Sequence, residues 1–538
     1  MPRIHGNARH FWIDFSIRGD MIAVFKEQEG KHMSFGVLVG IAIVVGLILT
    51  VGFLSGSRVK DSADFLSGSG KAGTFLVAGA IMGSLVGSQA TMGTAQLSFQ
   101  FGFSGWWFTL GCCFGCLVLG FVYSPKLRKS GCITELAIIT GEYGPASGAL
   151  SSVLCSIGIF ISVFSQVIAC AGLLSTLFPG TPLWAGALLS AIFMGLYVIF
   201  GGAWGAGMGG IVKLLLLCGV SFLGLFFILY RSQGPAGLWN DLKELLAGTS
   251  LGMIRREATG APNISDTDAL KAQFLSVVAR GVVKDLSSGI SLLLGVLCTQ
   301  SYAQAIWSGK SDQSARRGAL ISAVAAPFIG LCGVAVGLFM RSHYMLRAEA
   351  EALMAAGKAL PDLPILETTI RTMPTFALDH FPPLVAGVIL GTLLITAVSG
   401  GAGLSFGMAT ILTRDILKRL SHRWDDPKQE LRAVRICIGG VLLAAVAVTV
   451  SLPDSLINDF GFLSMGFRAS VLFLPMTAAL WLPGRVDDRC ILLSMILSPC
   501  ADILAKLLSL PGDPLLWGMA VSLLCCTVGW IRGKRKGA

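Results

Sequence analysis

Apolar runs of about 20 residues recur along almost the whole chain, and they restrict its fold more than any other feature. An apolar helix of that length crosses a bilayer core of ~30 Å. Charged side chains make up only 13% of the 538 residues and hydrophobic ones 54%. A soluble protein of this size carries roughly twice that share of charge. The runs therefore predict an all-α, polytopic membrane protein with little sequence left for a soluble domain.

We predict about 13 transmembrane spans from these runs, several of which exceed 25 residues and must be tilted or interrupted. Their approximate cores are 34–55, 74–97, 104–124, 147–178, 182–200, 208–230, 276–306, 318–340, 383–412, 432–452, 456–481, 489–509 and 514–531. The polar stretch 1–32 lacks the apolar region of a signal peptide. We expect it to be a tail preceding one transmembrane domain over 33–538, with translation starting at Met1 or Met33.

Lysine and arginine gather in the loops that follow odd-numbered spans, which predicts the orientation. Such loops stay on the cytoplasmic side, so the N-terminus is expected outside and the C-terminus inside a cytoplasmic (inner) membrane. The richest loop follows span 9 and includes Arg414, Lys418, Arg419, Lys428, Arg432 and Arg435. These loops account for the net charge of +11, which therefore gives no reason to expect a nucleic-acid partner. The expected partners are the lipid bilayer and a small-molecule solute, and nothing sets the oligomeric state.

The cysteines and acidic residues argue against an enzyme or a metalloprotein. Most of the 14 cysteines lie inside apolar runs, where cysteine behaves as a small buried hydrophobe. We find no convincing zinc spacing, no paired carboxylates and no nucleophile motif at a plausible depth. No organic cofactor is expected.

The stretch from Ile395 to Lys418, ITAVSGGAGLSFGMATILTRDILK, differs from an ordinary lipid-facing span. Small residues crowd its first half, namely Ser399, Gly400, Gly401, Gly403 and Ser405. Small side chains allow a neighbouring backbone to approach closely. This helix is therefore expected to line a packed interface or a binding site.

Four segments in order resemble motifs of the sodium/solute symporter family. They are DFLSG at 64–68 leading to SGWW at 104–107; RKSG at 128–131 with Thr134, Glu135 and EYG at 142–144; Thr299-Gln300 through Arg316-Arg317-Gly318; and TRDI at 413–416. The resemblance covers about 350 residues and implies a leucine-transporter-like core of two inverted five-helix repeats. The repeats would be about 73–231 and 274–481, with 34–55, 489–509 and 514–531 peripheral. It also implies discontinuous helices in spans 2 and 7.

The composition of spans 2 and 7 agrees with such interruptions. Glycines and hydroxyl residues interrupt both spans, and exposed backbone at membrane depth is tolerated only beside a cavity or inside protein. Tight helix packing is the alternative explanation for any one glycine. The candidate substrate-binding residues are Ser88, Gln89, Gln166, Gly295, Thr299, Ser464 and Arg468. For Gln166 a polar contact between helices is an equally good explanation.

The resemblance implies a sodium site at which this chain departs from the family. The carbonyl ligands align with Gly83 and Val86, and the family's two adjacent hydroxyls align with Ser399 and Gly400, so one hydroxyl is lost. The family's Thr-Asp in span 6 aligns with Gly209 and Gly210, so the acidic residue is lost as well. Lys213 follows one helical turn later, on nearly the same face. Its ammonium either reaches the cytoplasmic interface or occupies the ion site.

Arg468 is expected about 12 residues into span 11, ~18 Å deep by helical rise. An arginine near the bilayer centre costs at least ~2.5 kcal/mol, so it should face protein or water. Two roles stay open: a bidentate clamp on a substrate carboxylate, or a structural partner for an acidic residue or free carbonyls.

The sequence thus predicts a secondary active transporter that moves a small organic solute, possibly a carboxylate, by alternating access. Sodium is the expected coupling ion, bound by Gly83, Val86 and Ser399. The alternatives are a sodium-independent or proton-coupled transporter with Lys213 replacing the ion, and a sensor that binds its solute without transporting it.

Overall fold

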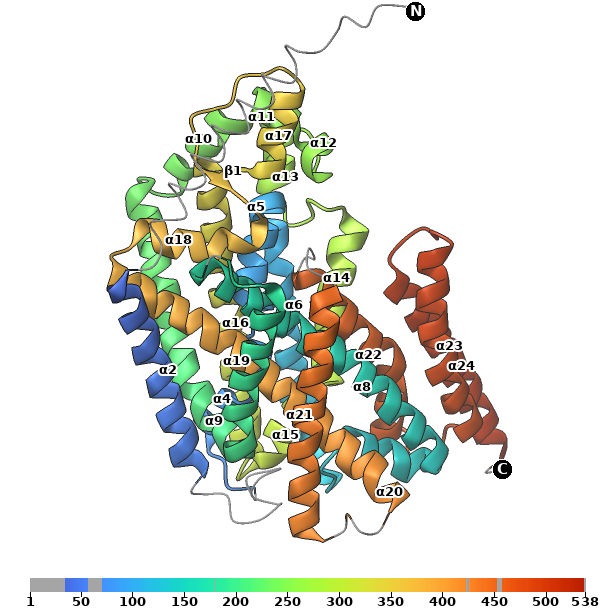
Figure 1. Ribbon diagram of the computed structural model, residues 1–538. Helices are drawn as coiled ribbons and strands as arrows, with labels where there is room; N and C mark the ends of the chain where they lie inside the picture. Colours follow the sequence, from blue (N-terminus) through green and yellow to red (C-terminus); the bar gives the residue numbers. More distant parts are fainter. Residues whose placement is uncertain are drawn as a thin grey trace, which may run out of the picture.

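Long apolar helices form the body of the molecule (Figure 1). The computed structural model describes residues 34–56, 70–178, 180–421, 424, 426–451 and 457–536. The predicted polar tail 1–32 and the DFLSG motif at 64–68 lie outside these residues. Among the described residues, nine helices are long and apolar enough to cross a membrane, or up to ten if the bent pair α14–α15 is one span. The polytopic all-α prediction is confirmed, whereas the total of 13 spans stays a prediction.

The first half of the bundle contains the first predicted break. In chain order its elements are α2 (Phe35–Gly56), α4 (Thr74–Leu85), the π-helix η2 (Gln89–Gly93), α5 (Thr94–Phe101), the 3₁₀-helix η3 (Gly102–Trp106), α6 (Trp107–Val118), the π-helix η4 (Leu119–Tyr123), α7 (Ser124–Lys129), α8 (Glu135–Leu177) and α9 (Leu183–Arg231). Within α8, Gly144 has a φ of +83° and Pro145 follows it. Since proline lacks an N–H and a positive φ favours glycine, the helix kinks there.

The long element α9 accounts for both spans predicted over 182–200 and 208–230. The Tyr197 hydroxyl lies directly against Gly209, twelve residues later. In one straight helix these residues would be about 18 Å apart along the axis. The chain must therefore bend sharply within α9, between Leu183–Val198 and Gly207–Arg231.

The second half contains the second predicted break. Its membrane elements are α14 (Val282–Leu297), α15 (Gln300–Ser308), α16 (Asp312–His343), α19 (Pro383–Ile411), the π-helix η6 (Leu412–Leu417), α20 (Lys418–Leu420), α21 (Pro427–Ser451), α22 (Ile457–Trp481), α23 (Asp488–Leu507) and α24 (Pro514–Lys536). Helices α8 and α22 pack along one another, while α23 and α24 pair at the edge of the bundle (Figure 1).

The two longest loops fold into a small helical lobe at one end, at the top of Figure 1. It contains α10 (Pro235–Leu246), α11 (Ser250–Met253), α12 (Arg255–Thr259), α13 (Thr267–Phe274), α17 (Arg347–Ala355) and a parallel pair of two-residue strands, β1 (Met345–Leu346) and β2 (Ile365–Leu366). The 3₁₀-helix η5 (Thr369–Arg371) and α18 (Thr372–His380) follow, and α18 packs on the bundle against α5, α16 and α19. Apolar side chains such as Leu246, Ile264 and Phe274 give this lobe its own core. We call this end the cap end, and the opposite one, with Arg128, Lys310 and Lys418, the basic end.

A buried ionic cluster ties the lobe to the bundle. Arg341 donates to Glu349 at 2.7 Å, and Arg255 lies 3.9 Å from the same carboxylate. Arg255 also donates to the carbonyl of Gln100, near the end of α5. Burial, and then the nearby charge of Arg341, lowers the pKa of Arg255 to about 9. The Glu349 carboxylate thus interacts with two guanidinium groups. These contacts hold α12, α16 and α17 together at the end of α5.

Membrane orientation can be tested at the two ends of the bundle. Cysteines introduced at Ser421 and at Asp268, both exposed, are expected to react from opposite sides. An impermeant maleimide should label Asp268→Cys in intact cells, and Ser421→Cys only after the membrane is opened, because the basic end is expected inside. The parent protein with its native cysteines is the control. Labelling of both positions from one side would contradict the predicted topology.

Candidate functional site

Both predicted helix breaks are present, and they lie in the bundle interior. Helix α4 ends at Leu85, Val86 leaves helical geometry with φ −88° and ψ 80°, and η2 starts at Gln89. The second break separates α14 from α15, which are bent by 46° relative to one another. The small residues of α19 face the first break, since a Cβ added at Gly400 would lie 3.1 Å from the Cα of Gly87. The expectation that this glycine-rich helix lines a packed interface is confirmed.

Helix α8 meets the first break with polar side chains. The Gln166 Oε1 accepts hydrogen bonds from the backbone N–H of Ser88 at 2.9 Å and from its hydroxyl at 2.7 Å. The Gln89 amide donates to the Ser165 hydroxyl at 2.7 Å. Because the unwound chain has lost helical hydrogen bonds there, Gln166 supplies an acceptor that water cannot supply inside a membrane. Gln166 therefore makes a polar contact between helices in this structure.

Helices α8, α22 and the second break meet at Arg468, which is fully buried. Its Nη1 donates to the Thr299 hydroxyl at 2.6 Å, and its Nε donates to the Ser464 carbonyl at 3.1 Å. Its Nη2 lies 3.0 Å from the Ser464 hydroxyl, 3.1 Å from the Met465 sulfur and 3.5 Å from the Ser162 hydroxyl. Each of these partners is neutral. The guanidinium is thus solvated by dipoles, and among the residues that the structure describes no carboxylate contacts it.

One face of α8 joins these two groups of contacts. Ser162, Ser165 and Gln166 lie at spacings of three and four residues, on one helical face. We use the name polar seam for Ser88, Gln89, Ser162, Ser165, Gln166, Thr299, Ser464 and Arg468. The structure brings together all the predicted substrate-binding residues, including Gly295, whose carbonyl accepts a hydrogen bond from the Thr299 hydroxyl at 2.5 Å. A Cβ added at Gly295 would lie 2.6 Å from the Met465 Cβ, so the glycine allows close packing there. That these residues bind substrate stays a prediction.

The sequence analysis missed three polar residues. Ser162 and Ser165 extend the polar seam along α8. Their i, i+3, i+4 spacing with Gln166 in an apolar helix was the sequence signal that could have revealed them. Asn458, near the start of α22, lies against Gly93 of η2. Both polar atoms of its amide are buried without a hydrogen-bond partner among the described residues. Nothing local in the sequence marks Asn458, because its surroundings come from a distant helix.

The side chain of Lys213 contacts one of the predicted sodium ligands, the carbonyl of Gly83. Lys213 is 1% exposed, and its Nζ donates to the Gly83 carbonyl at 2.8 Å. Lys213 therefore does not reach the cytoplasmic interface. The sequence analysis had left open whether its ammonium does so or occupies the ion site. The close approach of α9 to α4 explains why, since Gly210 lies directly against the carbonyl of Gly79. The Ser399 hydroxyl donates within its own helix, to the Thr396 carbonyl at 3.3 Å.

These residues do not fit a sodium ion while Lys213 occupies the Gly83 carbonyl. A sodium ion on the same oxygen would lie close to the ammonium. Two like charges 4 Å apart repel by about 4 kcal/mol at an effective dielectric constant of 20. Replacing the family's carboxylate by Gly210 removes the charge that would offset this repulsion.

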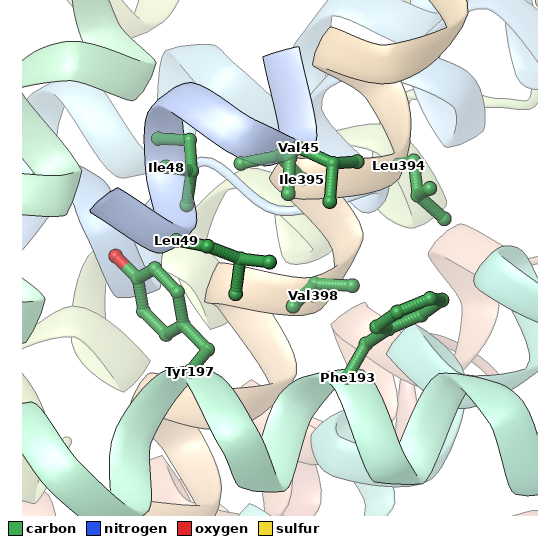
Figure 2. A pocket seen from close by; sticks show the side chains of 8 residues that line it. All are labelled: Val45, Ile48, Leu49, Phe193, Tyr197, Leu394, Ile395 and Val398. Atoms are coloured by element: carbon green, nitrogen blue, oxygen red, sulfur yellow. The ribbon is translucent and has the colours of Figure 1, made fainter. Parts of the chain in front are cut away.

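Two cavities flank α19, and only one of them is polar. The first is lined by Ser84, Ser301, Gln304, Ser308, Gly403 and Phe406, with Ala80 and Ala305, between α4, α15 and α19. Ser84 follows Gly83 directly, so this cavity lies next to the lysine site. Figure 2 shows the other pocket, between α2, α9 and α19, with side chains of carbon apart from the Tyr197 hydroxyl. An apolar pocket of this kind offers nothing to hold an ion or a charged solute.

Comparisons with known proteins agree with this architecture. The substrate-bound, outward-open structure of a Na⁺-coupled sialic acid symporter superposes with a TM-score of 0.71 at 16% identity, over 93% of this chain and 98% of that one. Mhp1, a nucleobase-cation-symport-1 family transporter, in a closed conformation with bromovinylhydantoin bound, gives 0.53 at 10% identity, over 89% and 95%. At these identities the likeness establishes the fold.

Sequence comparison identifies the family. An uncharacterized symporter of Bacillus subtilis (strain 168), YwcA, is 25% identical over 174 residues, which are 32% of this chain and 34% of that protein. The match thus spans about a third of the length of this curated relative. The sequence model of the sodium:solute symporter family matches residues 65–497, which include both helix breaks and the polar seam. This chain belongs to the sodium:solute symporter family.

Proposed function

We propose that this protein is a secondary active transporter for a small organic anion, in which Lys213 takes the place of the family's sodium ion. The observation that carries the proposal is the hydrogen bond from the Lys213 ammonium to Gly83, a predicted sodium ligand. A resident cation at that carbonyl supplies the positive charge that would otherwise come from solution. Transport would then not require sodium.

Arg468 supports an anionic solute. It lies at the meeting point of the second break, α8 and α22, and its partners in this structure are neutral. A guanidinium presents a planar fork of N–H donors that matches a carboxylate with two parallel hydrogen bonds. A solute carboxylate that displaced the Thr299 and Ser464 hydroxyls would balance the buried charge. Neutral solutes could not provide this compensation.

Sodium coupling is the second candidate, because this chain belongs to a family named for it and shares the fold of a Na⁺-coupled symporter. It would require Lys213 to leave Gly83 during the transport cycle. Gly83, Val86 and Ser399 would then have to hold the ion without the family's carboxylate and second hydroxyl. The proposed location is the cytoplasmic membrane with the basic end inside.

Uptake into proteoliposomes tests this proposal. A panel of radiolabelled carboxylates is offered at fixed pH, with sodium or with choline in its place, and the amide of each acid serves as the neutral control. We expect uptake of at least one carboxylate to be unchanged in choline and uptake of its amide to stay at the level of empty liposomes. Uptake that falls to that level without sodium would reject the replacement of the ion by Lys213. Equal uptake of acid and amide would reject the anion requirement.

A further inference from the structure

A buried carboxyl group lies on the basic side of the second helix break and has no part in the mechanism so far. Glu135, the first residue of α8, is 2% exposed. Its Oε2 is buried without a hydrogen-bond partner among the described residues. An ionised carboxylate with a buried oxygen that lacks a partner is costly. The structure around it should therefore show what balances its charge.

The position of Glu135 is fixed by the first residue of α15. Its backbone N–H donates to the Gln300 Oε1 at 3.0 Å, and the Gln300 amide donates to the Ile133 carbonyl at 2.9 Å. Arg468 holds the neighbouring residue of the same break through the Thr299 hydroxyl. Glu135 and Arg468 thus contact adjacent residues, one from the first turn of α8 and the other from α22.

The ionisable side chains around Glu135 are Arg468, Tyr123 of η4, Cys155 of α8 and Cys298 at the break. Arg468 is the cation of this set. Asp415 of η6 lies at the same end, where it accepts a hydrogen bond from Thr134 and interacts with Arg414 and Arg419. Asp415 therefore has its own counter-charges, whereas Glu135 depends on Arg468.

We propose that Glu135 binds the proton that is transported together with the solute anion. Without solute, the Arg468 guanidinium favours the ionised form of Glu135 across the break. When a solute carboxylate binds Arg468, two negative charges face one positive charge, which favours the protonated form of one of them. A proton then forms an O–H bond with a Glu135 oxygen. Once the solute leaves on the other side, Glu135 returns this proton to water, so that one anion and one proton cross together without net charge.

This inference rests on the proposed function, because it needs a solute carboxylate on Arg468. It adds the coupling step that a fixed ammonium at Gly83 does not supply. Proton and solute must favour each other's binding to the same degree, since coupling between two binding sites is reciprocal. Lys213 would stay at the Gly83 carbonyl, and Glu135 would change its charge once per cycle.

The Glu135→Gln variant separates coupling from transport. Glutamine is close in shape and leaves the backbone hydrogen bond to Gln300 in place. In proteoliposomes we expect exchange of labelled for unlabelled solute to persist, while accumulation driven by an inward proton gradient falls to the level of empty liposomes. Glu142→Gln is the matched control on the same helix, since Glu142 is not fully buried and contacts Gly484. It should accumulate solute like the parent, and Glu135→Asp should recover part of the accumulation.

Solute binding to the parent protein gives a second, independent readout. Isothermal titration in two buffers of different ionisation enthalpy should show about one proton taken up per carboxylate bound. No proton uptake, or proton-driven accumulation by Glu135→Gln, would overturn the role of Glu135 and leave the anion transporter intact. Failure of the parent to bind or transport any carboxylate would instead overturn the proposed function. If Glu135→Gln does not fold, the proton count on the parent still decides.

Discussion

Arg468→Lys is expected to weaken the binding of a carboxylate solute by about 10- to 100-fold, or about 1.4–2.8 kcal/mol, while the protein still folds. Lysine keeps the positive charge but loses the planar fork that can bind both oxygens of a carboxylate. It also cannot span Ser464 and Thr299 with separate nitrogens, as the guanidinium does. Equilibrium binding of the labelled solute to the purified protein measures the effect, and a thermal melt reports folding.

Arg341→Lys is the matched control for this change. Arg341 is also buried, but it lies at the cap end and pairs with Glu349 at 2.7 Å. Lysine there retains the charge opposite the carboxylate, so solute affinity should change by less than about twofold. A solute affinity that Arg468→Lys leaves unchanged would contradict the role of Arg468 as a bidentate clamp on a carboxylate. A variant that no longer folds would assign Arg468 a structural role in joining α8, α22 and the second break.

Lys213→Ala is expected to reduce solute uptake at least about tenfold, and Ser399→Ala to change it by less than twofold. Alanine removes the ammonium from the Gly83 carbonyl, and a buried carbonyl that loses its donor costs about 1–3 kcal/mol. The Ser399 hydroxyl donates within its own helix, so its loss leaves the lysine contact intact. Uptake by both variants is measured in choline and in sodium at fixed pH.

The sodium-coupled alternative predicts the opposite pattern for this pair. If Ser399 binds sodium, Ser399→Ala should raise the sodium concentration needed for uptake sharply, and Lys213→Ala should have the smaller effect. Lys284→Ala, an exposed lysine near the start of α14, controls for loss of a positive charge elsewhere. Uptake by Lys213→Ala equal to that of the parent in choline would contradict the replacement of the ion.

The helix breaks and the packed glycine-rich helix could be predicted because their causes are local. Glycines and hydroxyl residues in spans 2 and 7 weaken a helix wherever they occur, and the breaks at Val86 and Cys298 lie within these stretches. Arg468 was expected to face protein or water, and its full burial shows that it faces protein. Its depth in the membrane stays a prediction. The alternation of apolar runs and basic loops was enough to predict a polytopic fold. The predicted number of spans was not confirmed.

The partners of the buried polar groups could not be predicted in the same way. Whether Lys213 reached the interface or Gly83 depended on how closely α9 approaches α4, which is set by contacts such as Gly210 on Gly79. Glu135 drew attention only as part of a family-like motif, because its proximity to Arg468 arises from the second break. The cap-end lobe could not be predicted either, since its core forms between segments separated by about 70 residues of chain.

The order of synthesis places Lys213 and Arg468 after their acceptors. Gly83 leaves the ribosome before Lys213, and Ser162 and Thr299 leave it before Arg468. A lysine or arginine entering a bilayer alone costs about 2.5–3.5 kcal/mol. When α9 and α22 insert, the oxygens that receive their charges already belong to helices in the membrane. Vectorial biogenesis thus lets each charged helix exchange water for protein oxygens, and a circular permutation that reversed this order would remove that advantage during insertion.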